Sequence, residues 1–257
     1  MIDIHAHILP GMDDGAEDLQ DTLEMARMAV ENGTMVMVAT PHCNLPGIYD
    51  NYYDENYIET FRRVKRALQE HEIPLTLLPG LEVFATPDLP ELIREGLIQT
   101  INGSRYLLLE FPFEEESEYV NAILDDVMKM GLCPVVAHAE RYEFVQKGPG
   151  IVDQWKEKGI LIQVNKASLM GKFGRAAYHA AHLMMRRFQV DVIASDCHRP
   201  YMRTPMMEDV YLSLARKYPE VYLAVLFEEN PEKICRNEAV TSFAAAHGLQ
   251  FDGKHRI

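Results

Sequence analysis

Seven short apolar runs, spaced along the chain up to residue 195, constrain its fold more than any other feature. The runs cover residues 2–8, 35–40, 75–83, 105–111, 134–138, 160–165 and 190–195. Most of them are continuous β-rich hydrophobic segments, which is typical of strands that are buried on both faces of a parallel sheet. We therefore interpret each run as a strand.

The segments between these runs have the periodicity of amphipathic helices. In segment 17–33 the apolar residues fall on one helical face, and Gly33 provides a C-terminal stop. Residues 55–71, 117–130 and 174–188 have similar helical character. Strand and helix in steady alternation predict a parallel sheet. Seven such repeats without a break favour a closed or nearly closed α/β barrel over an open doubly wound sheet.

Length and composition agree with one large folded unit. The chain has 257 residues, of which 47% are hydrophobic, so a full core is expected and extensive disorder is not. We expect one domain over residues 1–257, helical after residue 205 and with a loose tail beyond about residue 240, which includes the final segment FDGKHRI.

Charge and motifs exclude several classes of ligand. The net charge of −14 argues against a nucleic-acid partner, because phosphate backbones are bound by a surplus of lysine and arginine. A phosphorylated substrate is still compatible with this net charge if the site supplies its own cations. No GxGxxG follows a strand, and MGKFG at 170–174 lacks the spacing of a P-loop.

The cysteines and the chain start indicate a cytoplasmic protein. The four cysteines are scattered and form no CxxC pair, which favours a reducing compartment over a disulfide framework. We find no signal peptide, and no apolar run approaches the ~20 residues that span a bilayer. Membrane insertion is therefore not expected.

Polar side chains collect where the predicted strands end, which is where the chemistry of parallel α/β barrels is found. The candidates, in chain order, are His5, His7, Asp13, Asp14, His42, Glu82, Glu110, His138, Asp196 and His198. His5 and His7 are two residues apart on a strand and so share one face. The sixth run offers only Gln163, Asn165 and Lys166.

Each candidate alone has an ordinary structural explanation. A single histidine can be a core or loop residue, the DDG sequence at 13–15 is common in turns, and Asp196 can cap a helix. The joint pattern is harder to explain in this way. Carboxylates gathered on one rim would repel each other strongly without cations. Divalent ions remove this conflict, since imidazole suits transition metals and a carboxylate can bridge two ions. We therefore predict a metal centre.

The donor set is too large for one tetrahedral zinc ion, whose structural sites close at four ligands, so two or three ions are expected. Such clusters bind a phosphoryl group and lower the pKa of a shared water. Arg141 and Arg203 follow the predicted ligands closely and can clamp a phosphate, although surface salt bridges would also explain them. Cys43 and Cys197 adjoin ligands, but no CxxxxxR phosphate loop surrounds either one.

Eight short motifs occur in an order that matches a known family. They are an HxH start, LPGMDDG, ATPH, GxE, LEFP, AHxERY, SLMGKFG and SDxH. Together they resemble the bacterial manganese-dependent protein-tyrosine phosphatases of capsule and exopolysaccharide loci, the CpsB/CapC/YwqE type within the PHP superfamily. The resemblance covers roughly residues 1–235 and implies a distorted (β/α)7 barrel of the PHP type with a trinuclear metal site.

The resemblance also implies roles for single residues. His5, His7, Glu82 and Asp196 would hold one ion; Glu82 would bridge to a second ion, held also by Glu110 and His138; and Asp14, His42 and His198 would hold the third. Arg141 and Arg203 match two arginines that bind and stabilise the phosphoryl group. Manganese is the expected ion, with iron, cobalt or zinc also compatible. Ala139 and Arg199 depart from the family pattern, which has Pro and Asn there, and Arg199 is expected to add positive charge at the rim.

The implied activity is hydrolysis of phosphotyrosine, notably on the C-terminal tail of a bacterial tyrosine autokinase that regulates capsular or exopolysaccharide synthesis. A metal-bridging hydroxide would attack phosphorus and tyrosinate would leave. The main alternative is a PHP phosphomonoesterase acting on a small molecule such as histidinol phosphate. A nucleic-acid phosphodiesterase and a non-catalytic kinase-binding module are weaker alternatives. Tyrosines in 44–57 either pack against an aromatic leaving group or are ordinary loop residues.

Overall fold

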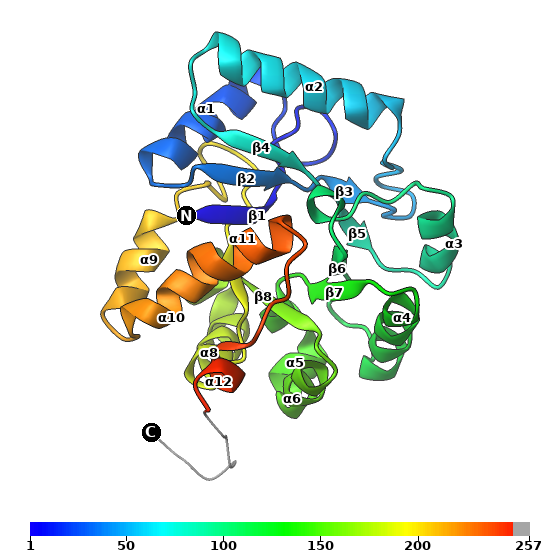
Figure 1. Ribbon diagram of the computed structural model, residues 1–257, viewed down its shortest axis with the longest axis vertical. Coiled ribbons are helices and arrows are strands. Elements are labelled where there is room, and N and C mark those ends of the chain that lie inside the picture. The colour runs from blue at the N-terminus through cyan, green and yellow to red at the C-terminus, as the bar shows by residue number, and fades with distance from the viewer. Residues whose placement is uncertain (249–257) are drawn as a thin grey trace.

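The computed structural model describes residues 1–248, which contain nine short strands surrounded by helices (Figure 1). The strands are β1 (Ile2–Ala6), β2 (Val36–Ala39), β3 (His42–Cys43), β4 (Thr76–Pro79), β5 (Glu82–Phe84), β6 (Tyr106–Glu110), β7 (Cys133–Val136), β8 (Leu161–Asn165) and β9 (Val192–Ala194). One sheet has the order β1-β2-β4 and the other the order β3-β5-β6-β7-β8-β9. All paired strands are parallel, as predicted.

The two sheets are consecutive parts of one curled wall. Two residues separate β2 from β3, and two residues separate β4 from β5. Because β2 pairs with β4 and β3 pairs with β5, both interruptions lie at the same height in the wall and together form the break between the two sheets. Pro41 lies between β2 and β3, and Pro79 ends β4. A proline has no N–H to give to a ladder, which explains why pairing stops there. The predicted run 75–83 is therefore two strands, and β3 was not predicted.

The last strand returns to the first. Ala6 bridges to Cys197 in parallel, and the His7 N–H donates to the Cys197 carbonyl oxygen at 2.9 Å. The buried carboxylate of Asp3 accepts a hydrogen bond from the Ser195 N–H at 3.1 Å. Seven strand positions thus follow one another around a distorted parallel barrel, which confirms the predicted fold class.

Helices cover the outside of this wall (Figure 1). They are α1 (Leu19–Glu31), α2 (Glu55–Glu70), α3 (Leu89–Arg94), α4 (Ser117–Lys129), α5 (Glu143–Lys147), α6 (Gly150–Glu157), α7 (Lys166–Leu169), α8 (Gly174–Arg186), α9 (Glu208–Ala215), α10 (Glu220–Ala224), α11 (Asn230–Cys235) and α12 (Phe243–Ala246), with short turns η1 (Ile101–Gly103) and η2 (Ala139–Arg141) and a π-helical segment η3 (Val225–Glu229). The four helices expected from periodicity are α1, α2, α4 and α8. Side chains of Asp18 and Asp54 cap α1 and α2 by accepting backbone N–H groups.

The barrel interior has an apolar layer with a polar layer above it. Ile4, Val38, Leu108, Val135, Leu161, Val192 and Ala194 form the apolar layer, and Ile101, Ile234 and Cys235 pack against it. Ile234 and Cys235 belong to α11. This helix closes the end of the barrel where the strands begin, because Asn237, just after the helix, accepts a hydrogen bond from the N–H of Arg105, which directly precedes β6. Buried polar side chains occupy the other end, where the strands finish. The chemistry is therefore confined to one mouth of the barrel.

Past residue 240 the chain forms α12, whose Phe243 packs into the outer core. The segment FDGKHRI, which we expect to be loose, lies outside the described residues. Within residues 1–248 no helix has both the length and the apolar character needed to cross a bilayer.

Gly80 allows the close approach at the break between the sheets. A Cβ atom there would lie 2.7 Å from Val38 Cγ1 and 3.2 Å from Thr40 Cγ2. We expect Gly80→Ala to lower the free energy of unfolding by about 1–3 kcal/mol through overpacking. Gly150→Ala is the matched control, because a Cβ there meets nothing within 4 Å and should change stability little. Urea unfolding curves compare the two; equal stability would show that the break tolerates a side chain.

Candidate metal centre

Glu82 lies at the centre of the polar mouth and contacts four imidazoles. Its Oε1 atom is 3.1 Å from His5 Nε2 and 2.9 Å from His138 Nε2. Its Oε2 atom is 3.2 Å from His7 Nε2 and 3.1 Å from His42 Nδ1. These histidines come from β1, the segment after it, β3 and the end of β7, so one carboxylate joins four parts of the barrel rim.

Asp196 and Glu110 each contact two of the four imidazoles that surround Glu82. Asp196 Oδ1 is 3.5 Å from His5 Nε2 and 3.4 Å from His7 Nε2. Glu110 places Oε1 3.4 Å from His138 Nε2 and Oε2 3.3 Å from His42 Nδ1. Each imidazole therefore lies between two carboxylates, which is the arrangement expected for ligands of shared ions.

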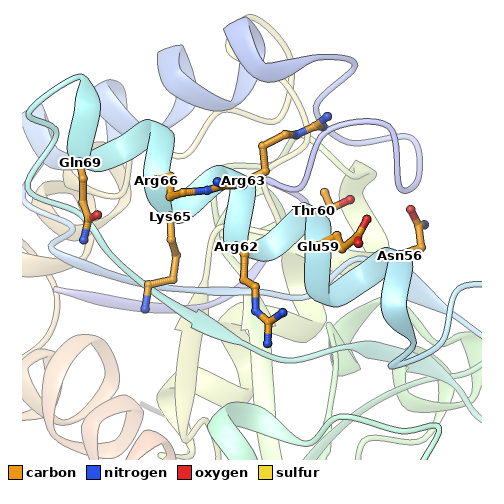
Figure 2. A pocket seen from close by; sticks show the side chains of 8 residues that line it. All are labelled: Asn56, Glu59, Thr60, Arg62, Arg63, Lys65, Arg66 and Gln69. Carbon is orange, nitrogen blue, oxygen red and sulfur yellow. The ribbon is translucent and has the colours of Figure 1, made fainter.

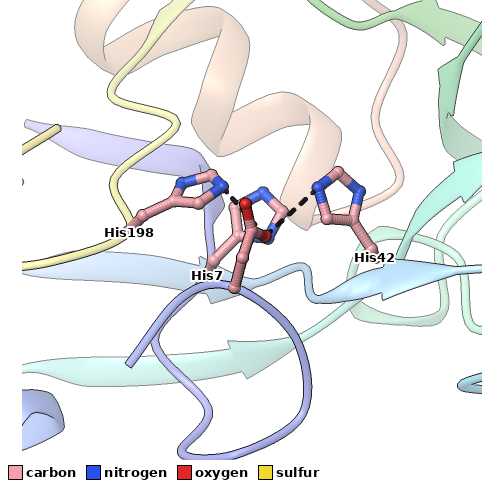
Figure 3. A group of neighbouring side chains, drawn as sticks. His7, His42 and His198 are labelled. Carbon is pink, nitrogen blue, oxygen red and sulfur yellow. Dashed lines mark ion pairs between the residues drawn. The ribbon is translucent and has the colours of Figure 1, made fainter. Parts of the chain in front are cut away.

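Asp14 completes the set at the solvent side, where its side chain is 52% exposed. Its Oδ1 atom lies 3.6 Å from His42 Nε2 and 3.4 Å from His198 Nε2. Figure 3 shows the imidazoles of His7, His42 and His198 converging. All nine predicted donors thus belong to one continuous network. Three groups within it have ligand atoms that lie within 4.8 Å of one another: His7, Asp14, His42 and His198; His5, His7 and Asp196; and His42, Glu82 and Glu110.

The arrangement of the donor atoms favours bound divalent cations over hydrogen bonds among the donors themselves. His5 Nε2 and His7 Nε2 face each other at 3.2 Å, although only one of them can donate to the other. Imidazole nitrogens lie 3.1–3.3 Å from Glu82 Oε2 and Glu110 Oε2, yet among the described residues none of them forms a hydrogen bond with these buried atoms. Buried polar atoms are normally satisfied, and mixed imidazole and carboxylate donors are typical of manganese, iron, cobalt or zinc. The residues present therefore fit bound metal ions.

Electrostatics keep the carboxylates charged despite their burial. Burial alone would raise the pKa of Glu82, but His5 and His42 hold that pKa well below its usual range. Burial alone would lower the pKa of His138, yet Glu110 and Glu82 raise it to about 10. The carboxylate of Glu82 thus stays anionic beside the protonated imidazole of His138, and a metal ion would take the place of that proton.

Three of the site residues hold a left-handed backbone. The φ angles of His138, Asp196 and Arg203 are 35°, 51° and 54°. Such a conformation costs a non-glycine residue about 1–3 kcal/mol, and it persists only where the surroundings impose it. Here the His138 N–H donates to Gln163 Oε1 at 2.9 Å, which fixes the turn at the end of β7. Strain at these positions is consistent with a functional role for them.

Asp13 orients His7 and supports the rim from behind. Its Oδ2 atom is 2.6 Å from His7 Nδ1 and accepts the His42 N–H at 2.8 Å. The ring of His7 is thereby turned so that Nε2 faces Glu82. Gly15 is required beside it, because a Cβ there would lie 2.1 Å from the His7 carbonyl oxygen. The sequence explains Asp13 as a turn residue. Its second role, in orienting His7, was indicated only by the neighbouring acidic residue Asp14.

β8 contributes positioning groups. Gln163 Oε1 lies 3.1 Å from His5 Nδ1, which leaves the Nε2 atom of that ring facing Glu82. The Asn165 side-chain amide donates to Asp196 Oδ2. The sequence places both residues at the end of the sixth strand but gives them no role, because their partners lie on other strands.

The two predicted arginines lie beside the network in different environments. Arg203 pairs with Asp196, and its Nη1 atom donates to His198 Nε2 at 3.0 Å. The Arg141 guanidinium is stacked between Phe113, at 4.1 Å, and Phe173, at 4.4 Å from the ring centroids. Among residues 1–248 its nitrogen atoms have no ion pair or hydrogen bond. Its N–H groups are therefore available to a ligand.

The cysteines near the rim are unsuited to nucleophilic attack. Cys43 and Cys197 are free but fully buried. Burial raises the pKa of Cys197 to about 12, and that of Cys43 also rises. A protonated, inaccessible thiol is inert.

A family model for capsular polysaccharide synthesis, CpsB/CapC, matches residues 1–236. The chain belongs to the CpsB/CapC family. Curated relatives include the tyrosine-protein phosphatase YwqE of Bacillus subtilis, 32% identical over 240 residues that cover 93% of each chain. The tyrosine-protein phosphatase CpsB of Streptococcus pneumoniae is 29% identical over 245 residues, 93% of this chain and 100% of that protein. The family resemblance seen in the motifs is thereby confirmed.

The fold of this CpsB/CapC member matches a solved relative closely. A crystal structure from a study of YwqE and CpsB, described there as unique metal-dependent tyrosine phosphatases, superposes with a TM-score of 0.87 at 32% identity, covering 94% of this chain and 97% of the other. One of this member's departures from the pattern has little effect on the rim charge. Arg199 pairs with Glu17 and lies 3.5 Å from Asp21, so its charge is compensated.

Proposed function

We propose that this chain is a metal-dependent protein-tyrosine phosphatase, a phosphoric monoester hydrolase acting on phosphotyrosine. The observation that carries the proposal is the meeting of nine imidazole and carboxylate donors in one mouth of the barrel, with two arginines beside them. The names of the two relatives support the choice of tyrosine phosphate among phosphomonoesters. Histidinol phosphate is the comparison substrate in the test below.

The proposed metal centre holds three divalent ions, with manganese as the proposed metal. His5, His7, Glu82 and Asp196 would hold one ion, Glu82, Glu110 and His138 a second, and Asp14, His42 and His198 a third. The contacts of Glu82 with four imidazoles support its bridging role. When bound, such ions supply electrostatic stabilisation of phosphoryl oxygens and a lowered pKa of water.

The chain's own residues would bind and orient the phosphoryl group. Arg141 presents free N–H groups while its faces are covered by Phe113 and Phe173, so its guanidinium is held in place without a competing carboxylate. Arg203 contacts both Asp196 and His198, and it can direct one of its N–H groups toward a phosphate oxygen. Two guanidinium groups at the mouth would stabilise the negative charge that grows as the ester bond breaks.

An aromatic side chain is available for the leaving group. The ring of Tyr49 stacks on His42, with centroids 5.7 Å apart and planes 4° apart. It belongs to the loop between β3 and α2, which the sequence places at the rim. We propose that this ring packs against the tyrosyl group of the substrate.

The wider setting is proposed on the same basis. We propose one PHP-type phosphatase domain over residues 1–257, supported by the unbroken family match to residue 236. The proposed substrate is the phosphotyrosine-bearing tail of a bacterial tyrosine kinase that regulates capsule synthesis, and the proposed location is the cytoplasm. The family description supports the link to capsule synthesis, and the relatives' names support a phosphotyrosine substrate.

Phosphate release by metal-depleted and manganese-reconstituted protein tests the function. We expect reconstituted protein to hydrolyse a phosphotyrosine peptide, and chelation to remove at least about 99% of the rate, since the ions provide several kcal/mol of stabilisation. Histidinol phosphate, assayed beside it, should be hydrolysed far more slowly. Activity that survives complete metal removal, or a preference for histidinol phosphate, would refute the proposal.

Asp13→Asn tests the support behind His7. The substitution removes the negative charge 2.6 Å from His7 Nδ1 while keeping the side-chain shape. We expect metal affinity to fall by about 10–100-fold, the usual effect of losing a group that orients a ligand. Manganese titration measures this effect, with exposed Asp50→Asn as the control. Unchanged manganese affinity would show that Asp13 only forms the turn and does not support the metal site.

A further inference from the structure

α2 carries a dense group of positive charges on an otherwise acidic chain. Arg62, Arg63, Lys65 and Arg66 are four of the 25 basic residues in a protein with a net charge of −14. All four are exposed. Figure 2 shows them along one helix, where they line a hollow together with Asn56, Glu59, Thr60 and Gln69. We call this surface the α2 basic face.

Among residues 1–248 these cations have no anionic partners. Lysines and arginines elsewhere, such as Lys147 on α5 and Arg236 directly after α11, form ion pairs with a glutamate four residues earlier. Within the described residues no carboxylate lies within ion-pair distance of the four α2 side chains; Lys65 only lies over the Phe61 ring, at 5.9 Å. Like charges three and four residues apart on a helix repel each other. The arrangement therefore disfavours the helix and leaves four positive charges available to a partner.

The α2 basic face begins beside the turn that carries Asp14, one donor of the metal centre. Asn56, at one end of the hollow, places its Nδ2 atom 3.6 Å from Met12 Sδ, beside the turn that carries Asp14. Asn51, in the loop before α2, donates to the His42 carbonyl oxygen at 3.0 Å. At about 1.5 Å per residue, Arg62 and Arg66 lie about 9 and 15 Å along the helix from Asn56. An extended polypeptide covers that length with about three to five residues.

We propose that the α2 basic face docks an acidic segment of the same polypeptide that presents its phosphotyrosine to the metal centre. This inference rests on the proposed phosphatase function. The segment's aspartates, glutamates or further phosphates would pair with the four cations while one phosphotyrosine occupies the mouth. Such complementarity acts mainly on the encounter of the two molecules, so it changes kcat/KM through KM.

A polypeptide fits this surface better than a lipid bilayer does. Helices that lie on membranes insert an apolar face beside their basic residues. The apolar side chains of α2, including Tyr57, Val64 and Leu68, are buried against the barrel instead. None of the large hydrophobic side chains exposed on the described surface belongs to α2.

Two phosphotyrosine peptides that differ only in their flanks test the proposal. One has Asp and Glu at positions three to six on either side of the phosphotyrosine, and the other has Asn and Gln there. Wild-type protein with manganese is expected to show about five- to tenfold higher kcat/KM on the acidic peptide, and the preference should fade at high ionic strength. Arg62→Gln with Arg66→Gln should reduce the ratio to near one. Arg216→Gln with Lys217→Gln, an exposed basic pair near the end of α9, should leave the ratio unchanged.

The set of results distinguishes failure of this inference from failure of the proposed function. Equal rates on the two peptides, or a preference that survives in the α2 variant, would overturn the docking role and leave the phosphatase function standing. Phosphate release from neither peptide would overturn both. Binding of wild-type protein to phosphatidylserine vesicles through Arg62 and Arg66, without any peptide preference, would overturn docking in favour of a membrane role.

Discussion

Replacing Glu82 by glutamine is expected to reduce kcat/KM on a phosphotyrosine peptide by about a thousandfold or more. Glu82 contacts His5, His7, His42 and His138, so losing its charge affects every proposed ion at once. The lost stabilisation amounts to several kcal/mol, and each 1.4 kcal/mol is about tenfold in rate. Metal content, measured by mass spectrometry, should fall in parallel.

The control for this substitution is Glu118→Gln, an exposed carboxylate in the first turn of α4. It should keep both the rate and the metal content of the wild type. A Glu82→Gln protein that is folded and retains wild-type rate and metal content would remove Glu82 from the centre and invalidate the proposed bridging role.

Arg141→Lys is expected to lower kcat/KM by about a hundredfold while the metal content stays the same. Lysine keeps the charge but loses the planar group that Phe113 and Phe173 hold at 4.1 and 4.4 Å. It also loses the paired N–H donors that bind a phosphate in two places. Removal of one such donor typically lowers kcat by about 10²–10³-fold.

Arg105→Lys is a matched control for this substitution. Arg105 also stacks on an aromatic ring, that of Tyr106 at 5.4 Å, but it lies at the opposite end of the barrel. Steady-state kinetics with both variants separate the effect of losing a stacked arginine from the effect of losing an arginine at the mouth of the barrel. Equal activities for the two would show that Arg141 has no contact with the phosphoryl group.

The barrel could be predicted because buried parallel strands leave a strong local signal. Runs such as 105–111 and 160–165 are mostly apolar, and the spacing of the runs indicated the number of repeats. β3 gave no such signal, since two residues show no periodicity. The interruption of the run 75–83 depends on Pro79 lying beside Ala39 in the neighbouring strand, which is a contact between distant segments.

The candidate donors could be predicted because strand ends in a parallel barrel meet at one mouth, whatever the loops do. The groups that orient them could not. Asp13 contacts His7 nearby in sequence, but Gln163 reaches His5 across 158 positions. The stacking of Phe113 and Phe173 on Arg141 likewise depends on how two separate loops fold. Motif order identified the family without revealing these contacts.

Anomalous diffraction from crystals of the manganese-loaded protein tests the central claim most directly. We expect strong manganese peaks within the cluster formed by His5, His7, Glu82 and Asp196 and by the neighbouring donors. Crystals of Glu82→Gln protein grown in the same way should show weakened or missing peaks. A fully active wild-type enzyme whose crystals contain manganese only outside this cluster, or none, would contradict the account.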